Sequence, residues 1–323
     1  MQRRQLLAGI AAATLAAPAV RAQSGWPHEK PMRLICPFAP GAATDAMARL
    51  AAQKLGEKLG VSVVVENRAG GAAVVGTQAV YQAPADGYTL LGSSLTHTML
   101  RHVLRSVPFD PQADFTPVAR TGRTPLLMVM SPKRPEKSIA EITAAAKAKP
   151  ADWTFAVSSL GAPGHLATID YMHRTGVQIE ATSYRGTAPA LTDVAGGSAQ
   201  LLIDATFALL QAARGGQVRP IGISTLQRFP LVPDMPTIVE AGLPGFEHYS
   251  WYGVWVRKGT PGEIVNRLNA ILVEAMREPD VQERMRGLAI EAIAQSPAEI
   301  EQYIAREVAK NAELLRIANF QPE

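Results

Sequence analysis

The chain is poor in the residues that build disulfide, metal and membrane-spanning proteins. It has one cysteine, Cys36, so no internal disulfide can form, and nothing near it in sequence favours a reactive thiolate. Its six histidines include no His-Glu-x-x-His pattern, and His97 and His102 lie about 140° apart on a helical wheel. No apolar run reaches the roughly 20 residues that span a bilayer. We therefore predict no metal site, no cofactor and no membrane-spanning helix.

Residues 1–22 have the pattern of an export signal. Arg3 and Arg4 precede an Ala-rich apolar run of about 15 residues, and Val20-Arg21-Ala22 places small residues where a signal peptidase cuts. Paired arginines favour the twin-arginine route, although a Sec signal also begins with positive charge, so both routes stay open. No cysteine lies at the cleavage point to carry a lipid anchor. We therefore expect a soluble periplasmic protein after cleavage.

Most of the basic character belongs to this leader. Removing Arg3, Arg4 and Arg21 lowers the formal net charge from +4 to +1. The rest of the chain has no Lys/Arg run with interleaved aromatic residues, so nucleic acid is a poor partner. The remaining 301 of 323 residues are many for one hydrophobic core and fit two lobes.

Strand-like apolar runs alternate with helix-like segments, an arrangement typical of parallel α/β sheets. The predicted strands are Arg33 to Cys36, Val61 to Glu66, Thr89 to Gly92, Leu126 to Met130, Thr154 to Val157, Leu201 to Ile203 and Ile221 to Ser224. Helix starts are predicted where Ser or Thr precedes Glu by three residues. These pairs are Ser138 with Glu141, Thr237 with Glu240, Thr260 with Glu263, and Ser296 with Glu299.

Two proline-rich stretches, Pro108 to Pro125 and Phe229 to Pro244, bracket a central block of the chain. We interpret them as crossings between lobes, near 119–126 and 225–250. The first lobe is then discontinuous, with residues 23–124 and 246–323, and the second lobe is residues 125–245. The alternative is that each stretch is a surface loop of one large sheet.

The loop from Pro37 to Asp45 joins a predicted strand to an amphipathic helix. Its prolines stiffen the backbone, Gly41 permits unusual backbone angles, and small Ala42 and Ala43 let a ligand approach the amides at the helix start. This pattern favours an anion site built from backbone amides. A plain strand-to-helix connection is the alternative, because the glycine spacings of P-loops and dinucleotide folds are absent.

Further loops repeat this logic. Asn67 to Ala73, Ser158 to His165 and Tyr184 to Pro189 each follow a strand-like run or precede a helix-like one. In open α/β sheets such loops gather beyond the carboxyl ends of the strands, where ligands bind. Uncharged hydroxyls in or near these loops could orient a ligand, although each alone is better explained as a cap or turn residue. They are Ser93, Ser94, Thr96, Ser158, Ser159 and Thr187.

Taken together, these and further segments resemble a known family, the periplasmic substrate-binding receptors of tripartite tricarboxylate transporters, called the Bug family. Each matching segment is weak alone, but together they follow the family's order across nearly the whole mature chain. The segments are Pro37 to Gly41 with Thr44-Asp45, Glu66 to Arg68, Ala83 to Thr89, Asp114 to Val118, His165 to Ala167, Tyr184 to Gly186, Pro189 to Asp193, Pro233 to Thr237, Glu240 to Phe246 and Gly259 to Pro261.

The resemblance implies a two-lobed α/β fold of the type II periplasmic binding proteins, in which each lobe is a mixed sheet flanked by helices. It also implies a monomer that captures a small carboxylate between the lobes, contacts membrane permease subunits and needs no cofactor. Carried over to this sequence, the residues implied for ligand binding are Phe38, Ala39, Gly41, Ala42, Ala43, Thr44, Asn67, Gly71, Ala72, Ser93, Ser94, Thr96, Ser158, Ser159, Gly161, Ala162, His165, Thr187, Ala188 and Asp204. Asp204 could meet a ligand amine or hydroxyl, or cap the next turn.

The chain departs from the family where ligand contact is expected. Ala42-Ala43 replaces the usual Gly-Gly, and Ala72 and Ala73 replace glycines of the second loop. Val157 replaces a serine that is usual in the family, Ser159 replaces a usual glycine, and Leu100-Arg101 replaces the usual Asn-Pro. These changes predict a less polar cleft and favour a larger or aromatic carboxylate over a simple C4 or C6 aliphatic diacid.

Two other functions fit parts of the sequence. An enzyme could use Ser158 or Ser159, His165 and Asp204 as nucleophile, base and orienting acid, but no Gly-x-Ser-x-Gly elbow is present, so we predict no catalysis. A periplasmic ligand sensor that feeds a signalling partner would use the same cleft and other exposed lobe surfaces. The sequence cannot separate a sensor from a transport receptor.

Overall fold

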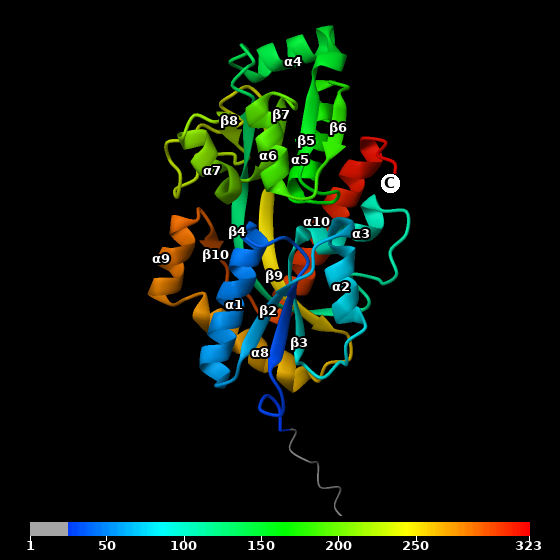
Figure 1. The fold of residues 1–323 in the computed structure, drawn as a ribbon, viewed down its shortest axis with the longest axis vertical. Helices are drawn as coiled ribbons and strands as arrows, with labels where there is room; N and C mark the ends of the chain where they lie inside the picture. The colour runs from blue at the N-terminus through cyan, green and yellow to red at the C-terminus, as the bar shows by residue number, and fades with distance from the viewer. Residues whose placement is uncertain (1–24) are drawn as a thin grey trace, which may run out of the picture.

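The computed structural model describes residues 25–323, so the predicted export signal lies outside the described residues. The chain forms two α/β lobes stacked along the long axis of the molecule (Figure 1). No helix within 25–323 combines the length and hydropathy needed to cross a membrane.

The first lobe, drawn at the bottom of Figure 1, is built from both ends of the chain. Its strands run in the order β2-β1-β3-β9-β4; the first three are parallel, and β9 is antiparallel to both β3 and β4. Its elements are β1 (Met32–Cys36), α1 (Ala43–Leu59), β2 (Val63–Asn67), the 3₁₀ turn η1 (Gly71–Ala73), α2 (Val74–Tyr81), β3 (Thr89–Ser94), α3 (Leu95–Val103), β9 (Tyr249–Arg257), α8 (Gly262–Ala275), α9 (Pro279–Gly287), β10 (Glu291–Ala292) and α10 (Pro297–Ile317).

The second lobe is built from the central block. Strand β5 is parallel to β6 and β7, and β7 is antiparallel to β4. Its elements are α4 (Ile139–Ala148), the 3₁₀ turn η2 (Pro150–Asp152), β5 (Thr154–Val157), α5 (Pro163–Thr175), β6 (Glu180–Ser183), α6 (Thr187–Gly196), β7 (Leu201–Ala205), α7 (Thr206–Arg214) and β8 (Arg219–Ile223). Both lobes are therefore mixed sheets flanked by helices, as predicted.

One long strand, β4 (Phe115–Met130), runs through both lobes (Figure 1). Its residues up to Pro125 pair with β9, and those from Leu126 onward pair with β7, so its partner changes between these two residues. The chain returns from the second lobe to the first near Ser224 and His248. Two hydrogen bonds hold this segment: Leu126 N–H donates to Ser224 Oγ, and His248 N–H donates to Ser224 O. The lobe boundaries stay a prediction, placed near this change of partner.

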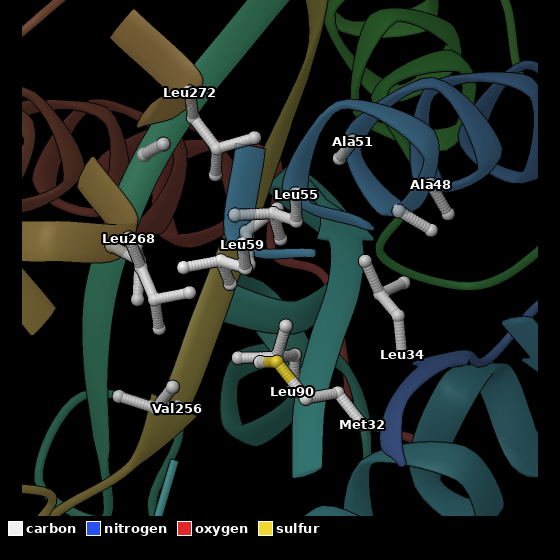
Figure 2. Packing of buried hydrophobic residues seen from close by; sticks show 14 of the residues in the cluster. Met32, Leu34, Ala48, Ala51, Leu55, Leu59, Leu90, Val256, Leu268 and Leu272 are labelled. Carbon is white, nitrogen blue, oxygen red and sulfur yellow. The ribbon is translucent and has the colours of Figure 1, made fainter. Parts of the chain in front are cut away.

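Each sheet face is covered by apolar helix faces. In the cluster shown in Figure 2, Leu34 and Leu90 of the sheet meet Leu55 of α1 and Leu268 of α8, all fully buried. Truncating one such leucine to alanine typically costs about 2–5 kcal/mol of unfolding free energy. This core fixes the start of α1 relative to the carboxyl ends of β1 and β3.

A second apolar cluster crosses from one lobe to the other. Leu166 and Ile169 of α5 pack with Met99 of α3, Trp251 of β9 and Leu314 of α10. Helix α10 thus contacts α3 of the first lobe and α5 of the second. The C-terminal helix therefore braces the two lobes, which the sequence pattern did not predict.

The sequence did not indicate several local features. Residues 115–125 of the proline-rich stretch Pro108 to Pro125, interpreted as a crossing between lobes, belong to strand β4, and the strand admits Pro117 because its register with β9 shifts there. Strands β6 and β9 were not predicted. Thr237 and Glu240 form both reciprocal capping hydrogen bonds, but only turns follow, which Gly242 at φ +111° ends. Helix α8 begins at Gly262, where Thr260 Oγ1 donates to Arg257 O instead of capping the helix.

Candidate functional site

The predicted ligand residues lie at the connections where strands end and helices begin. Phe38, Ala39, Gly41 and Ala42 form the β1–α1 loop, and Ala43 and Thr44 open α1; Asn67 ends β2, Gly71 and Ala72 lie in η1, Ser93 and Ser94 end β3, and Thr96 lies in the first turn of α3. In the second lobe Ser158, Ser159 and Gly161 lie between β5 and α5, Ala162 and His165 lie at the start of α5, Thr187 and Ala188 open α6, and Asp204 lies in β7. The elements that carry the two sets come together where the lobes meet (Figure 1).

The first loop is held by a network around Asp45. The carboxylate of Asp45 accepts hydrogen bonds from Gly41 N–H (3.0 Å), Arg49 Nε (3.1 Å) and Asn67 Nδ2 (2.8 Å). Asn67 Nδ2 also donates to Phe38 O (3.0 Å), and its Oδ1 accepts from Arg49 (3.0 Å). Both ends of the Asn67 amide therefore hold the loop together. These hydrogen bonds lower the pKa of Asp45 despite burial, which acts to raise it.

The second loop adopts a strained backbone. Ala72 and Ala73 have φ values of +51° and +81°, in the left-handed region that costs a non-glycine residue roughly 1–2 kcal/mol. Within this loop, these are also the two positions where alanine replaces the family's glycine. The start of α2 therefore has a backbone conformation that costs alanine more free energy than glycine.

A small cavity beside α1 contains two unpaired hydroxyl groups. Ser93 and Tyr252 are 1% and 2% exposed, and neither hydroxyl makes a hydrogen bond to any residue within 25–323. Both residues, with Thr44 and Thr121, line the same cavity. A buried hydroxyl without a partner costs about 1–3 kcal/mol, and this cavity has no room for a water molecule, so both hydroxyls stay unsatisfied in this conformation. Tyr252 was not predicted, since a tyrosine within an apolar strand carries no sequence signal of its own.

The β3–α3 connection is a capped helix start. Ser94 Oγ accepts from Thr96 N–H (3.4 Å) and donates to Thr96 Oγ1 (3.1 Å), and both residues are buried. Their hydroxyls are thus occupied by each other. Ser93, one residue earlier, is the member of this group that remains without a partner within the described chain.

In the second lobe Asp204 joins two helix starts. Its Oδ2 accepts from Thr187 Oγ1 at the start of α6 (2.7 Å), and its Oδ1 accepts from Ala205 N–H (2.7 Å). Burial raises the pKa of Asp204 above its ordinary value, against the opposing effect of these hydrogen bonds. Both carboxylate oxygens of Asp204 are therefore engaged within the second lobe.

His165 is committed to its own loop. Gly161 N–H donates to His165 Nδ1 (3.0 Å), and the ring packs edge-on against Phe320 with centroids 5.2 Å apart. Burial lowers the pKa of His165 to about 4, so at neutral pH the ring is uncharged and Nδ1 can accept. This hydrogen bond leaves Nδ1 unavailable as a base for Ser158 or Ser159.

Other reactive side chains are equally buried. Burial raises the pKa of the Cys36 thiol to about 12, and the side chain belongs to the first-lobe core. Within the described residues no three His, Cys, Asp or Glu side chains gather to hold a metal ion.

Four of the helices that begin at the predicted ligand loops or beside them have no side-chain cap, whereas α3 is capped by Ser94. Ala42, Ala162, Gly186 and Ala205 precede α1, α5, α6 and α7, and none forms a capping hydrogen bond with its side chain. By contrast, α4 and α10 begin at Ser138 and Ser296, whose hydroxyls accept from the helix backbone. Uncapped first-turn N–H groups are donors for an anion, and the helix dipole favours negative charge there.

A groove larger than the cavity at Ser93 and Tyr252 lies elsewhere in the described chain. With a volume of about 700 Å³, it runs beside α9 and β10 and is lined by Arg123, Leu226, Phe229, Tyr249 and Arg286 among others. None of the predicted ligand residues lines it. Its arginines are paired with carboxylates: Arg123 with Glu291 and Arg286 with Glu283. The uncapped helix starts and unpaired hydroxyls, not this groove, therefore define the candidate site.

Comparison with known proteins identifies close similarity over most of the chain. The family described as "Tripartite tricarboxylate transporter family receptor" matches residues 47–320. Protein BugT of Bordetella pertussis is 35% identical over 318 residues, covering 98% of this chain and 97% of BugT.

Solved structures agree with the sequence comparison. The structure of R. palustris Rpa4515 with adipate is 35% identical with a TM-score of 0.88, covering 92% of this chain and 100% of that one. Periplasmic binding protein BugD is 31% identical with a TM-score of 0.84, covering 91% of this chain and 99% of that one. These proteins share the two-lobed fold described above.

Proposed function

The chain belongs to the tripartite tricarboxylate transporter receptor family, and on that premise we propose that it captures a small carboxylate between its lobes in the periplasm and delivers it to a membrane transporter of that type. The observation that carries the proposal is the set of uncapped helix starts. Helices α1, α5 and α6 point N–H groups toward the region between the lobes, and no side chain satisfies them from the preceding residue.

The two lobes divide the ligand between them. In the first lobe the loop Phe38 to Thr44 holds one carboxylate group through backbone amides, with Ser93 and Tyr252 as hydroxyl partners beside it. In the second lobe the uncapped start of α6 contributes backbone amides, because Thr187 Oγ1 already donates to Asp204. Asp204 accepts from a ligand hydroxyl or amine.

Changes at the loops point to the ligand class. Alanine at 42, 43, 72 and 73 adds methyl groups where glycine would leave backbone exposed. We propose a carboxylate with a larger apolar or aromatic body, which shares only its carboxylate with the adipate of the Rpa4515 structure. A thermal-shift screen of aliphatic, amino-acid and aromatic carboxylates tests this. Stabilisation by succinate, citrate or acidic amino acids alone would refute the larger ligand and leave the receptor function standing.

Gly41 offers the sharpest test of the first loop. It has φ +84°, and a Cβ there would meet no atom within 4 Å, so a side chain strains the backbone without a clash. Gly41→Val is expected to weaken ligand affinity at least tenfold while the urea midpoint falls little. Native mass spectrometry of the freshly purified protein identifies the ligand for calorimetry. Unchanged affinity in Gly41→Val would show that this loop does not hold the carboxylate.

Delivery to a transporter is tested by its partners. Pull-down from membranes with and without ligand should recover permease subunits, more strongly with ligand, because the liganded lobes present a different joint surface. Recovery of a sensor kinase without permease subunits would replace the transport role with a sensing role.

A further inference from the structure

The last residues of the chain reach across to the second lobe. The ring of Phe320, three residues beyond α10, packs edge-on against His165 of α5, with centroids 5.2 Å apart and planes at 72°. His165 in turn accepts the N–H of Gly161 through Nδ1 (3.0 Å). Phe320, close to the C-terminus, therefore contacts a loop of the proposed ligand site through His165.

The tail itself is tied to the first lobe. Glu323 N–H donates to Val103 O (3.1 Å) at the end of α3, and Arg105 N–H donates back to Glu323 O (2.9 Å). Arg105 Nε also donates to Pro322 O (3.0 Å). This three-bond clamp fixes the position from which Phe320 contacts His165.

The loop that the tail supports is also packed directly on α3. A Cβ at Gly161, which has φ +70°, would lie 2.9 Å from Val103 Cγ2. Leu160 packs in the same apolar cluster as Val103 and Phe320. Residues 158–162 of the second lobe are thus held between α3, the tail and α5.

We propose that Phe320 is a positioning residue for the ligand site: the tail segment 320–323 straps the loop 158–162 to the first lobe and holds its amides and hydroxyls in the binding arrangement. The inference rests on the proposed function, since it concerns the same cleft. Phe320 does not touch the ligand. It acts through His165, whose Nδ1 orients the Gly161 amide and thereby the start of α5.

The test compares Phe320→Ala with Phe320→Tyr and Ile317→Ala. Phe320→Tyr keeps the ring, and Ile317 is an exposed apolar residue at the end of the same helix. Hydrogen exchange of the Gly161 amide, measured without ligand, is expected to quicken about tenfold in Phe320→Ala and to stay within twofold in both controls. Equal exchange in all four proteins would overturn the strap.

Ligand binding supplies the second readout. With the carboxylate that gives the largest thermal shift in the screen, and adipate as the first probe, Phe320→Ala should dissociate ligand about tenfold faster with little change in the urea midpoint. Faster exchange with affinity within twofold of the parent would overturn the positioning role.

Gly41→Val separates the two proposals. If it loses binding while Phe320→Ala does not, the strap is wrong and the receptor function stands. If no carboxylate binds the parent protein, the proposed function fails, and the strap's role in binding fails with it.

Discussion

At the scale of single residues, polar side chains in this site hold loops more than they face a ligand. Asn67 and His165, both predicted as ligand residues, direct their hydrogen-bonding atoms to Phe38, Asp45 and Gly161. The donors left for an anion are backbone amides and the hydroxyls of Ser93 and Tyr252. Uncharged donors suit a receptor that must also release its ligand.

Asp45 is expected to be the residue on which the first loop depends. The two carboxylate oxygens of Asp45 accept three hydrogen bonds, and Asp45→Asn removes the negative charge and replaces one of these oxygens with an amide nitrogen. We therefore expect a loss of about 1–3 kcal/mol of unfolding free energy, measured by urea denaturation. Ligand affinity should fall as well, because Gly41 loses its anchor. Glu57→Gln, an exposed acid on the same helix, is the control and should change stability by less than 0.5 kcal/mol, roughly the limit for surface substitutions. Equal effects in both variants would contradict this role.

A second buried carboxylate makes stability depend on pH. Burial acts to raise the pKa of Asp170, but hydrogen bonds from His248 Nε2 and Arg174 Nε, each 2.8 Å, outweigh it and lower the pKa below the ordinary 3.8. Because the folded pKa is lowered, the stabilisation is present above about pH 3.8 and is lost as pH falls through the folded value.

Asp170→Asn should therefore destabilise the protein at pH 7 by about 1–3 kcal/mol, with the difference from the parent shrinking below pH 3.8. Urea midpoints between pH 7 and pH 3 measure this. The exposed Asp152→Asn is the control. A difference that stays constant down to pH 3 would show that Asp170 is not the titrating group.

At the scale of elements, helix starts divide into capped and uncapped classes. Helices α3, α4 and α10 begin with serine caps, whereas α1, α5 and α6 follow alanine or glycine and have no side-chain cap. Helices α8 and α9, away from the predicted ligand loops, also lack a side-chain cap. An uncapped start leaves its first-turn N–H groups available to a ligand.

Helix α10 belongs to the capped class. Ser296 and Glu299 form a full capping box, in which Glu299 N–H donates to Ser296 Oγ and Ser296 N–H donates to Glu299 Oε2. Ser296→Ala is expected to cost about 1 kcal/mol by urea denaturation and to leave ligand affinity unchanged. Ser106→Ala, an exposed loop serine, should be neutral. A loss of affinity with no loss of stability would be the opposite of this expectation.

At the scale of the whole molecule, the lobes are joined by β4, by the return passage at His248 and by α10. The apolar cluster of α3, α5 and α10 lies between them, so movement of one lobe must shift packed side chains. A ligand that bridges the lobes adds to this interface and binds only the folded chain.

Ligand binding should therefore stabilise the protein by mass action. At a ligand concentration a hundred times Kd, the gain is about 2.7 kcal/mol. For a chain of this size, differential scanning calorimetry should show a rise in Tm of roughly 4–5 °C. Gly41→Val at the same ligand concentration is the control and should show little rise. A full rise in that variant would place the carboxylate outside the first loop.

Local pattern in the sequence was enough to determine the α/β alternation, seven of the strands, the serine caps of α4 and α10, and the family, because strand composition, capping pairs and motif order are properties of neighbouring residues. It also predicted where the cleft loops lie. Strand β6 was not predicted because its residues Glu180–Ser183 are mostly polar and exposed. Strand β9, the short β10 and the proline-bearing half of β4 were not predicted either, and β9 and β10 each pair with β4 across more than 100 residues of chain.

Only the tertiary structure decided what each polar side chain does. Asn67 donates to Asp45, and Asp204 accepts from Thr187. His165 accepts from Gly161 and packs against Phe320. The hydroxyls of Tyr252 and Ser93 have no partner within the described residues. These partners are set by packing between distant segments, and a hydrogen bond depends on distance and angle rather than on sequence spacing. The chain's residues specify the frame of this receptor family, whereas the folded packing decides which hydrogen-bond donors stay unpaired.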